Sequence, residues 1–167
     1  GQYLSVCYQD TTRVYSIASS SARDEIEFCI RRVPGGQMTA ELAVDLERGN
    51  TVALRGPYGD LLLEGLSTRD IVFLATGTGV APFKSMIDYL FETGRDRYEG
   101  EPRDVWLILG AAWRDTLPYY DEFRTYADRR ENFHFVPTAS RESYLTDWDG
   151  ETAYVQHTLT KYLDEDA

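Results

Sequence analysis

One segment constrains the fold of this chain more than any other: a short apolar run that leads into a glycine-rich turn. Residues 71–75, Ile-Val-Phe-Leu-Ala, carry no polar side chain, as expected of a strand that is buried on both faces of a sheet. The turn Thr76-Gly77-Thr78-Gly79 follows directly, and Pro82 suits the first turn of a helix that we expect to end near residue 93. A buried strand, a turn and a helix in this order predict a unit of parallel α/β structure.

The same alternation continues through the rest of the chain. Further buried strands are expected at residues 105–109 and 133–138, and helices at residues 119–130 and 157–163. Buried strands that alternate with amphipathic helices predict a doubly wound parallel sheet, which we assign to an α/β domain over residues 67–167.

The first part of the chain has the shorter period of β-strands. Strands are expected at residues 3–8, 14–18, 25–31 and 51–55. One helix is expected at residues 38–46, and Gly56-Pro57-Tyr58-Gly59 is typical of a turn. This pattern predicts part of an antiparallel β-barrel or sandwich over residues 1–66, with the domain boundary in the polar stretch 64–70.

Charge and composition argue against several classes of protein. The 167 residues include 28 acidic and 17 basic side chains, and a net charge of −11 would repel a nucleic-acid backbone. The longest apolar run, residues 105–113, is shorter than the roughly 18–20 residues of a membrane span. Cys7 and Cys29 are too few for a disulfide scaffold, and the first residues lack the basic region of a signal peptide. We expect a cytoplasmic protein without a membrane span, and we assign no residue to a metal.

The glycine-rich turn is a candidate nucleotide site. It follows the carboxyl end of a predicted strand, where open α/β sheets bind ligands. Glycines let the backbone approach a pyrophosphate, and the start of the next helix offers free N–H groups. Pro82 takes the place of the third glycine of the G-x-G-x-x-G fingerprint, so an ordinary glycine-rich turn is the alternative interpretation.

A second candidate site lies on the predicted strand near residue 15. Arg13 and Tyr15 are two positions apart and therefore point to the same face of a strand. The arginine can hold a phosphate through two hydrogen bonds, the tyrosine ring can lie against a flavin, and Ser16 adds a hydroxyl beside them. An exposed strand face with ordinary cross-strand pairs is the alternative.

Taken together, these stretches resemble the ferredoxin–NADP reductase family, and the resemblance extends from Gly1 to about Leu159. Four motifs of the family occur in order: R-x-Y-S at residues 13–16, a glycine-to-hydroxyl turn at 36–39, G-P-x-G at 56–59 and G-T-G-x-x-P at 77–82. The resemblance implies a partial FAD-binding β-barrel followed by an NAD(P)-binding α/β domain.

The resemblance implies a set of FAD contacts in the first domain. Tyr15 would stack on the isoalloxazine ring and Ser16 would lie near the flavin N5, which makes these two the predicted catalytic residues. Arg13 would hold the FAD phosphates, and Thr39 would donate to the pyrophosphate. The other implied contacts are Cys29, Ile30, Arg31, Gly36 and Met38.

The resemblance also implies a site for NADPH. Ser140 and Arg141 would grip the 2′-phosphate, while Tyr154 and Gln156 would pack against the adenine. Thr78, Gly79, Pro82, Gly110 and Ala111 complete the implied nucleotide contacts. Four nearby carboxylates lower the affinity for a phosphate and keep NADH open: Asp115, Glu142, Asp147 and Asp149.

The function implied is that of a flavoprotein oxidoreductase. It would move a hydride between NADPH and FAD and pass electrons to a one-electron acceptor such as a ferredoxin or another iron–sulfur protein. Two alternatives stay open: an NADH-dependent reductase component of an oxygenase system, and a non-catalytic subunit that binds flavin or nucleotide. After Leu66 the chain has 19 acidic and 11 basic residues, which argues against docking a typical acidic ferredoxin.

Family members have additional barrel strands before the first of these motifs and an additional strand after the last. We therefore expect this chain to be a segment of a longer protein, in which the N-terminal strands of the barrel and the C-terminal strand of the α/β domain are missing.

Overall fold

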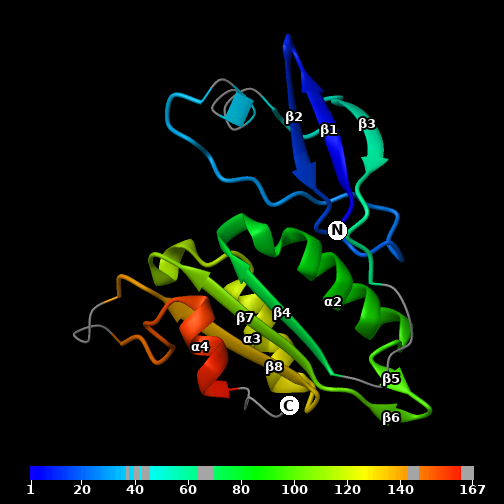
Figure 1. The fold of residues 1–167 in the computed structure, drawn as a ribbon. Coiled ribbons are helices and arrows are strands. Elements are labelled where there is room, and N and C mark those ends of the chain that lie inside the picture. Colours follow the sequence, from blue (N-terminus) through cyan, green and yellow to red (C-terminus); the bar gives the residue numbers. More distant parts are fainter. Residues whose placement is uncertain (37, 40–41, 43–45, 64–69, 143–146, 163–167) are drawn as a thin grey trace.

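The computed structural model describes residues 1–36, 38–39, 42, 46–63, 70–142 and 147–162. An antiparallel sheet forms the first part of the chain, and a parallel sheet covered by helices forms the second part (Figure 1). This arrangement confirms the predicted fold class. The predicted domain boundary at residues 66 and 67 lies outside the described residues.

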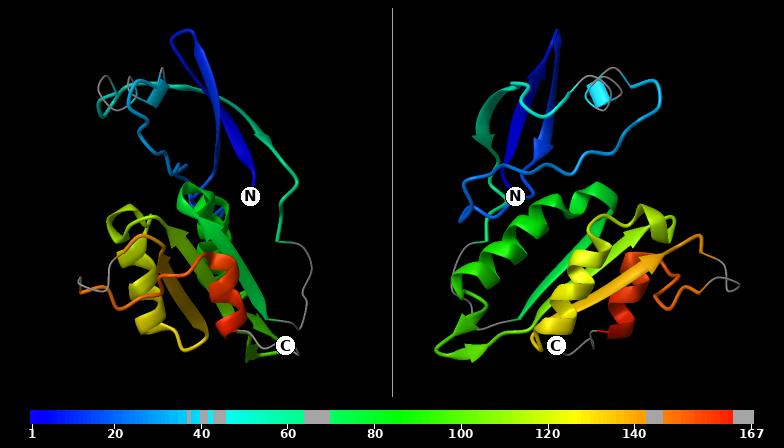
Figure 2. Two further views of the ribbon diagram at one scale, coloured as in Figure 1. Left: turned by 60° about the vertical axis from the view of Figure 1, so that its left-hand side comes forward. Right: turned by 180° about the vertical axis from the view of Figure 1, so that it is seen from behind.

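The second part, which we call the α/β part, contains three parallel strands in the order β4-β7-β8. The strands are β4 (Ile71–Thr76), β7 (Val105–Ala111) and β8 (Phe133–Ala139), and the helices are α2 (Ala81–Thr93), α3 (Tyr120–Arg129) and α4 (Val155–Tyr162). Helices α2 and α3 cover one face of the sheet, and α4 lies on the other (Figure 2). The sheet is therefore a central layer between helices, as predicted.

Alternation along β7 explains this layering. Val105, Leu107 and Leu109 point to one face, where they form a core with Phe91 of α2 and Phe123 of α3. Ile108 is fully buried on the other face, so β7 is covered on both sides. Strand β4 differs from the prediction, because Val72 and Leu74 are 41% and 38% exposed. Within the described residues β4 is an edge strand, and its apolar run is buried on one face only.

The first part, the β part, contains β1 (Tyr3–Tyr8), β2 (Thr11–Ser16) and β3 (Ala53–Tyr58) in the order β2-β1-β3. The predicted strand at residues 14–18 begins earlier and ends at Ser16, because a tight turn pairs Tyr8 with Thr11 and fixes the register. Of the predicted helix at residues 38–46, positions 38, 39 and 42 are helical and most others lie outside the described residues.

Two further predictions in the β part are wrong. Residues 25–31 form no strand; Phe28 makes a single bridge to Ile17, because the neighbouring side chains face the α/β part instead of a second strand. The turn expected at Gly56-Pro57-Tyr58-Gly59 is largely part of β3. A bulge lies there, because β3 advances by three residues where the paired part of β1 advances by two. Gly56 has φ +136, and a Cβ there would lie 2.7 Å from Leu4 Cδ2, so the bulge requires glycine.

A short hairpin, β5 (Arg97–Tyr98) with β6 (Glu101–Pro102), follows α2 and was not predicted. Its strands are only two residues long, too short for a periodic pattern in the sequence.

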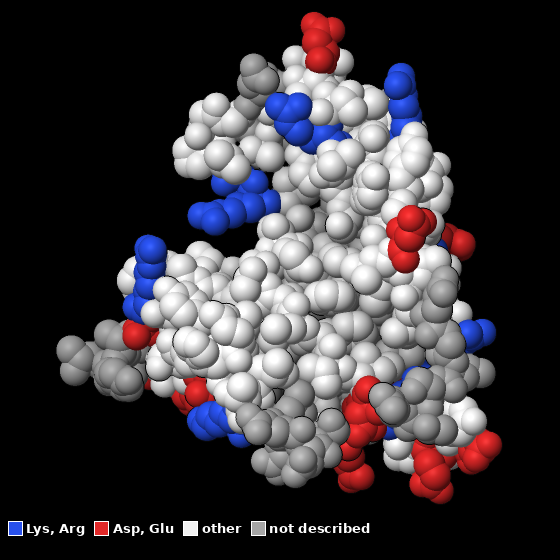
Figure 3. Space-filling model, viewed as in Figure 1, with Lys and Arg blue, Asp and Glu red and all other residues white. Residues whose placement is uncertain are grey.

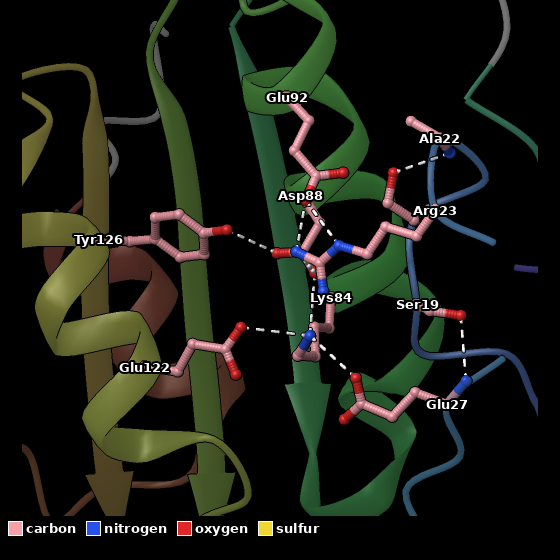
Figure 4. A network of polar contacts seen from close by, with 10 residues as sticks. Ser19, Ala22, Arg23, Glu27, Lys84, Asp88, Glu92, Glu122 and Tyr126 are labelled. Carbon is pink, nitrogen blue, oxygen red and sulfur yellow. Dashed lines mark hydrogen bonds and ion pairs between the residues drawn. The ribbon is translucent and has the colours of Figure 1, made fainter. Parts of the chain in front are cut away.

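A charge network with a buried centre joins the β part to the α/β part (Figure 4). We call it the interface cluster, and it consists of Arg23, Glu27, Lys84, Asp88, Glu92, Glu122 and Tyr126. Its centre is Lys84 of α2, whose side chain is 1% exposed. Three carboxylates surround the Lys84 Nζ: Asp88 at 2.9 Å, Glu122 at 3.2 Å and Glu27 at 3.4 Å.

Asp88, which is completely buried, has a partner for each of its oxygens. Oδ2 accepts from Lys84 and lies 3.1 Å from the Arg23 guanidinium, and Oδ1 accepts from the Tyr126 hydroxyl at 2.9 Å. Arg23 also pairs with Glu92 of α2. Burial alone would lower the pKa of Lys84, but the hydrogen bond and charge of Asp88 and the charge of Glu122 outweigh burial and raise it. Lys84 is therefore charged at neutral pH.

Removal of the Lys84 charge should destabilise the whole protein. In Lys84→Met the buried Asp88 carboxylate loses its closest cation, and we expect the free energy of unfolding to fall by about 3–5 kcal/mol in urea denaturation. The double variant Lys84→Met/Asp88→Asn should recover part of this loss, because it neutralises the carboxylate left behind. Losses that simply add in the double variant would contradict the pairing.

Candidate functional site

A cavity of about 830 Å³ opens between the β part and the carboxyl ends of β4, β7 and β8. Figure 3 shows a hollow at the side of the molecule, with Lys and Arg side chains on both sides of it. Many residues predicted from the sequence line this cavity, namely Cys29, Ile30, Arg31, Thr78, Gly110, Ala111, Ser140, Arg141, Tyr154 and Gln156. The cavity therefore lies where open α/β sheets bind ligands.

The glycine-rich turn forms the end of the cavity beside β4. Residues Gly77–Val80 make a short 3-10 helix that leads into α2, and Gly77 has φ +50. A Cβ at Gly77 or Gly79 would meet no atom within 4 Å, so open space lies against the backbone of the turn. A ligand can therefore approach this backbone closely. Gly79 and Pro82 do not line the cavity themselves; Pro82 is buried at the start of α2 and packs against Gly1.

The loop after β8 presents Ser140 and Arg141 to the cavity. The backbone N–H of Ser140 donates to Ala111 at 3.0 Å, and that of Arg141 donates to Ala112 at 2.8 Å, so both residues are fixed to the end of β7. The Arg141 side chain is exposed and makes no ion pair with any described residue. Its guanidinium is therefore available to an anionic ligand.

Three of the four carboxylates expected near Arg141 already have partners. Glu142 accepts from the backbone N–H of Arg114 at 2.9 Å, and the Arg114 guanidinium pairs with Asp147 at 3.0 Å. Asp149 lies 3.9 Å from Arg124. These pairs reduce the negative potential at the loop.

Arg31 faces the cavity from the opposite side. It comes from the β part, is exposed, and has no ion-pair partner among residues that the structure describes. Arg31 and Arg141 thus give a chain of net charge −11 a cavity with a cation on each side. Glycine backbone, open space and two free guanidinium groups fit a phosphorylated ligand that spans both parts.

Helix α4 closes the remaining side of the cavity. The Thr138 hydroxyl donates to the backbone of Ala153, and the backbone N–H of Ala139 donates to Glu151 at 2.8 Å, which holds the segment before α4 against β8. Tyr154, at the start of α4, is 63% exposed and leaves an aromatic face at the rim.

The cavity also contains residues that the sequence reasoning missed. They are Thr116, Pro118, Thr138, Ala153 and Val155, whereas Thr76 and Gly77 belong to the glycine-rich turn and Ala112 and Trp113 to the loop after the second predicted strand of the α/β domain. Thr138 stands near the carboxyl end of a parallel strand, so its place at the end of the predicted strand 133–138 could have identified it. Val155 has no comparable signal, because only the packing of α4 brings it to the site.

The three β2 residues predicted to hold the flavin ring and the phosphates of FAD lie outside this cavity. Arg13 is exposed there, Ser16 is half-buried, and the half-buried Tyr15 ring lies 6.2 Å from that of Phe28. Phe28 directly precedes the cavity residue Cys29, so the two sets of residues adjoin. An exposed guanidinium beside an aromatic ring on a strand is consistent with a phosphorylated flavin.

The predicted pyrophosphate turn is compact. The backbone N–H of Val33 donates to the Thr39 hydroxyl at 3.0 Å, and that of Gly36 donates to the Val33 carbonyl at 2.9 Å. A Cβ at Gly36 would lie 3.0 Å from Thr39 Oγ1, so the turn is tight at this glycine. Met38 is 2% exposed and is therefore a core residue in this structure.

The histidine and cysteine side chains beside and away from the cavity offer no catalytic group. His134 contacts Asp104 at 2.8 Å and stacks on Trp106, at the opposite end of the sheet. Burial raises the pKa of the Cys29 thiol, so Cys29 lines the cavity as a neutral group. Among the described residues, no group of three or more His, Cys, Asp or Glu side chains is placed to hold a metal ion.

Comparison with known proteins divides the chain into the same two parts. The family model described as "Oxidoreductase FAD-binding domain" matches residues 1–62, and the one described as "Oxidoreductase NAD-binding domain" matches residues 73–167. The second match alone covers more than half of the chain.

Curated relatives include reductases of several systems. The chain is 32% identical to protein RfbI of Salmonella typhimurium, with 98% of this chain and 47% of that protein covered. It is 32% identical to DmpP, the reductase component of phenol 2-monooxygenase from a Pseudomonas species (98% and 46% covered). It is 33% identical to leaf isozyme 1 of chloroplastic ferredoxin–NADP reductase from Oryza sativa (92% and 46% covered). The chain thus spans about half the length of the curated relatives it matches.

Solved structures of similar fold include two reductases. The cytochrome P450 reductase GcoB of Amycolatopsis has a TM-score of 0.80 and 27% identity, with 96% of this chain and 48% of that chain covered. A ferredoxin NADP+ reductase from Neisseria gonorrhoeae, solved with bound FAD and NADP, has a TM-score of 0.74 and 26% identity (96% and 63% covered).

No helix in the described part of the chain has the length and apolar character needed to cross a membrane.

A substitution at Gly110 tests how closely α4 packs against β7 beside the cavity. A Cβ at Gly110 would lie 2.5 Å from Val155 Cγ1, so Gly110→Ala should push α4 from β7 and lower the free energy of unfolding by about 1–3 kcal/mol in urea denaturation. Gly79→Ala is the control, because its new Cβ meets no atom within 4 Å and should leave stability unchanged.

The double variant Gly110→Ala/Val155→Ala removes the clashing methyl group and should restore part of the stability. If the double variant were less stable than Gly110→Ala by the full cost of a second independent substitution, the proposed contact would be refuted.

Proposed function

Because this chain belongs to the ferredoxin–NADP reductase family, we propose that it forms the flavin- and nucleotide-binding region of an NADPH-dependent reductase. The reaction is hydride transfer between NADPH and FAD, followed by electron transfer to a one-electron acceptor such as a ferredoxin or another iron–sulfur protein. The bound flavin supplies the redox chemistry, and the residues of this chain bind and orient it.

One observation carries this proposal: the same cavity is lined by residues from the region that matches the FAD-binding family and from the region that matches the NAD-binding family. Cys29, Ile30 and Arg31 belong to the FAD-binding region, and the ends of β4, β7 and β8 belong to the NAD-binding region. Phe28 directly precedes Cys29, and its ring lies beside that of Tyr15, the residue predicted to contact the flavin. A nucleotide in this cavity would therefore lie next to the predicted flavin site. Such proximity is what direct hydride transfer requires.

In this proposal Tyr15 and Ser16 contact the flavin, and Arg13, Gly36 and Thr39 hold the rest of FAD, to which Met38, with its side chain buried, contributes only its backbone. Cys29, Ile30 and Arg31 line the space shared with the nucleotide. The nucleotide is bound by the turn at residues 77–82, of which Gly77 and Thr78 line the cavity, by the end of β7, and by the residues of two later segments: Ser140, Arg141, Tyr154 and Gln156.

The state of Arg141 favours NADPH over NADH. Its guanidinium has no partner among the described ion pairs, while the nearby Glu142 and Asp147 contact Arg114. A free arginine beside Ser140 suits a 2′-phosphate, whereas a site for NADH more often offers a carboxylate to the ribose hydroxyls.

A second candidate is an NADH-dependent reductase component of an oxygenase system. The similarity to a phenol 2-monooxygenase component favours it, as does the excess of acidic residues, which is unsuited to an acidic ferredoxin. The two candidates share the flavin chemistry and differ in nucleotide and electron acceptor.

The general function can be tested with the protein purified together with its FAD. Anaerobic addition of NADPH should bleach the flavin absorbance, as hydride transfer requires. A colourless protein, or a flavin that neither NADPH nor NADH reduces, would instead favour a non-catalytic binding subunit.

Arg141→Ala tests the choice of nucleotide. Loss of the guanidinium should raise the KM for NADPH about tenfold and leave the KM for NADH nearly unchanged, because only NADPH carries the 2′-phosphate. Arg114→Ala is the matched control, since that guanidinium is already paired with Asp147. An unchanged KM for NADPH in Arg141→Ala would refute this role.

Ser16→Ala tests the catalytic assignment on β2. Stopped-flow measurement should show flavin reduction by NADPH slowed about tenfold or more, with FAD still bound, because a hydrogen bond near N5 is lost. Val14→Ala is the control on the same strand; Val14 is 60% exposed. Equal rates in both variants would contradict the assignment of Ser16.

A further inference from the structure

The segment from Glu27 to Arg31 is a wall of the cavity with little support from its own backbone. Phe28 makes the single bridge to Ile17, and the Glu27 carbonyl accepts from Ala18 at 2.8 Å. Beyond that point, the backbone of Ile30 and Arg31 makes no hydrogen bond to any other described residue. The position of this wall must therefore depend largely on side-chain contacts.

Two side chains of the wall lead to the interface cluster. The Glu27 carboxylate pairs with Lys84 at 3.4 Å. The Cys29 thiol lies near the Tyr119 hydroxyl, and the Tyr119 ring lies 5.0 Å from the Lys84 Nζ. The ion pair of Glu27 thus links the wall directly to the buried ammonium group, and the Tyr119 ring lies beside the same group.

Lys84 is itself held by helices of the α/β part, which forms the other side of the cavity. It belongs to α2, which begins directly after the glycine-rich turn, and Asp88 and Glu122 hold its ammonium from α2 and α3. Tyr119 has φ +59, a left-handed conformation that is unusual for a tyrosine and that directs its side chain just before α3 begins. The wall is therefore connected through Lys84 to helices α2 and α3.

We propose that Lys84 is a positioning residue for nucleotide binding: through Glu27 and Tyr119 it holds the wall 27–31 and so sets the separation of Arg31 from Arg141 across the cavity. The ligand concerned is a phosphorylated nicotinamide dinucleotide that contacts both arginines, and the inference rests on the proposed function. Lys84 lies outside the cavity lining and acts only through the wall.

A matched pair of variants separates positioning from stability. Glu27 and Glu122 both contact Lys84, and the side chain of each is 40% exposed, but only Glu27 belongs to the wall. Glu27→Gln should raise the Kd for NADP+ in isothermal titration about three- to tenfold, whereas Glu122→Gln should change it less than about twofold. Both variants should lower the thermal midpoint of unfolding by similar amounts.

Turnover gives a second readout. Glu27→Gln should raise the KM for NADPH and leave kcat nearly unchanged, because the wall affects binding and the reacting groups are untouched. Tyr119→Phe provides an independent variant, since it removes the hydroxyl near Cys29 and keeps the ring beside Lys84. It should weaken NADP+ binding in the same direction.

The outcomes are distinguishable. If the unmodified protein does not bind NADP+, the proposed function fails. If it binds NADP+ and the Kd is the same in Glu27→Gln and Glu122→Gln, or is unchanged in both Glu27→Gln and Tyr119→Phe, the positioning role of Lys84 is overturned.

Discussion

The contact between Lys84 and Asp88 is the interaction on which the rest of this structure depends. Both side chains are buried, and each would be costly to bury alone. Both lie on α2, one turn apart, and their further contacts bring Arg23 and Glu27 from the β part and Glu122 and Tyr126 from α3 to the same place. Burial and the charge of Asp88 raise the pKa of Tyr126 to about 12, so its hydroxyl remains a donor at neutral pH.

This arrangement separates the electrostatics of the cavity from those of the chain as a whole. The net charge is −11, yet Arg31 and Arg141 face the cavity without acidic partners among the described residues. Acidic side chains nearby contact other groups, as Glu142 and Asp147 do with Arg114. Because salt screens the interactions of exposed charges beyond roughly 8–10 Å, a local cationic cavity can exist in an acidic protein.

Secondary structure was predicted correctly where the residues of a segment determine its conformation by themselves. The apolar run at residues 71–75, the glycines after it and Pro82 specify a strand, a turn and a helix without reference to distant residues. Predictions failed where the partner was distant. Residues 25–31 alternate like a strand, but Glu27 pairs with Lys84 of α2 and Cys29 lines the cavity, so only one bridge forms. Gly56-Pro57 reads as a turn, and pairing with β1 makes it a bulge within β3.

The sequence by itself determined the order of elements, the two-part organisation and most of the cavity residues, because periodicity, turns and ordered motifs are local properties. Only the tertiary structure decided that Lys84 is buried, since its neighbours in the sequence do not distinguish it from a surface lysine. Its partners come from residues 57 positions earlier and 38 positions later. Contacts over such separations depend on the packing of whole elements, and that packing also decides where Val155 and the wall 27–31 meet the cavity.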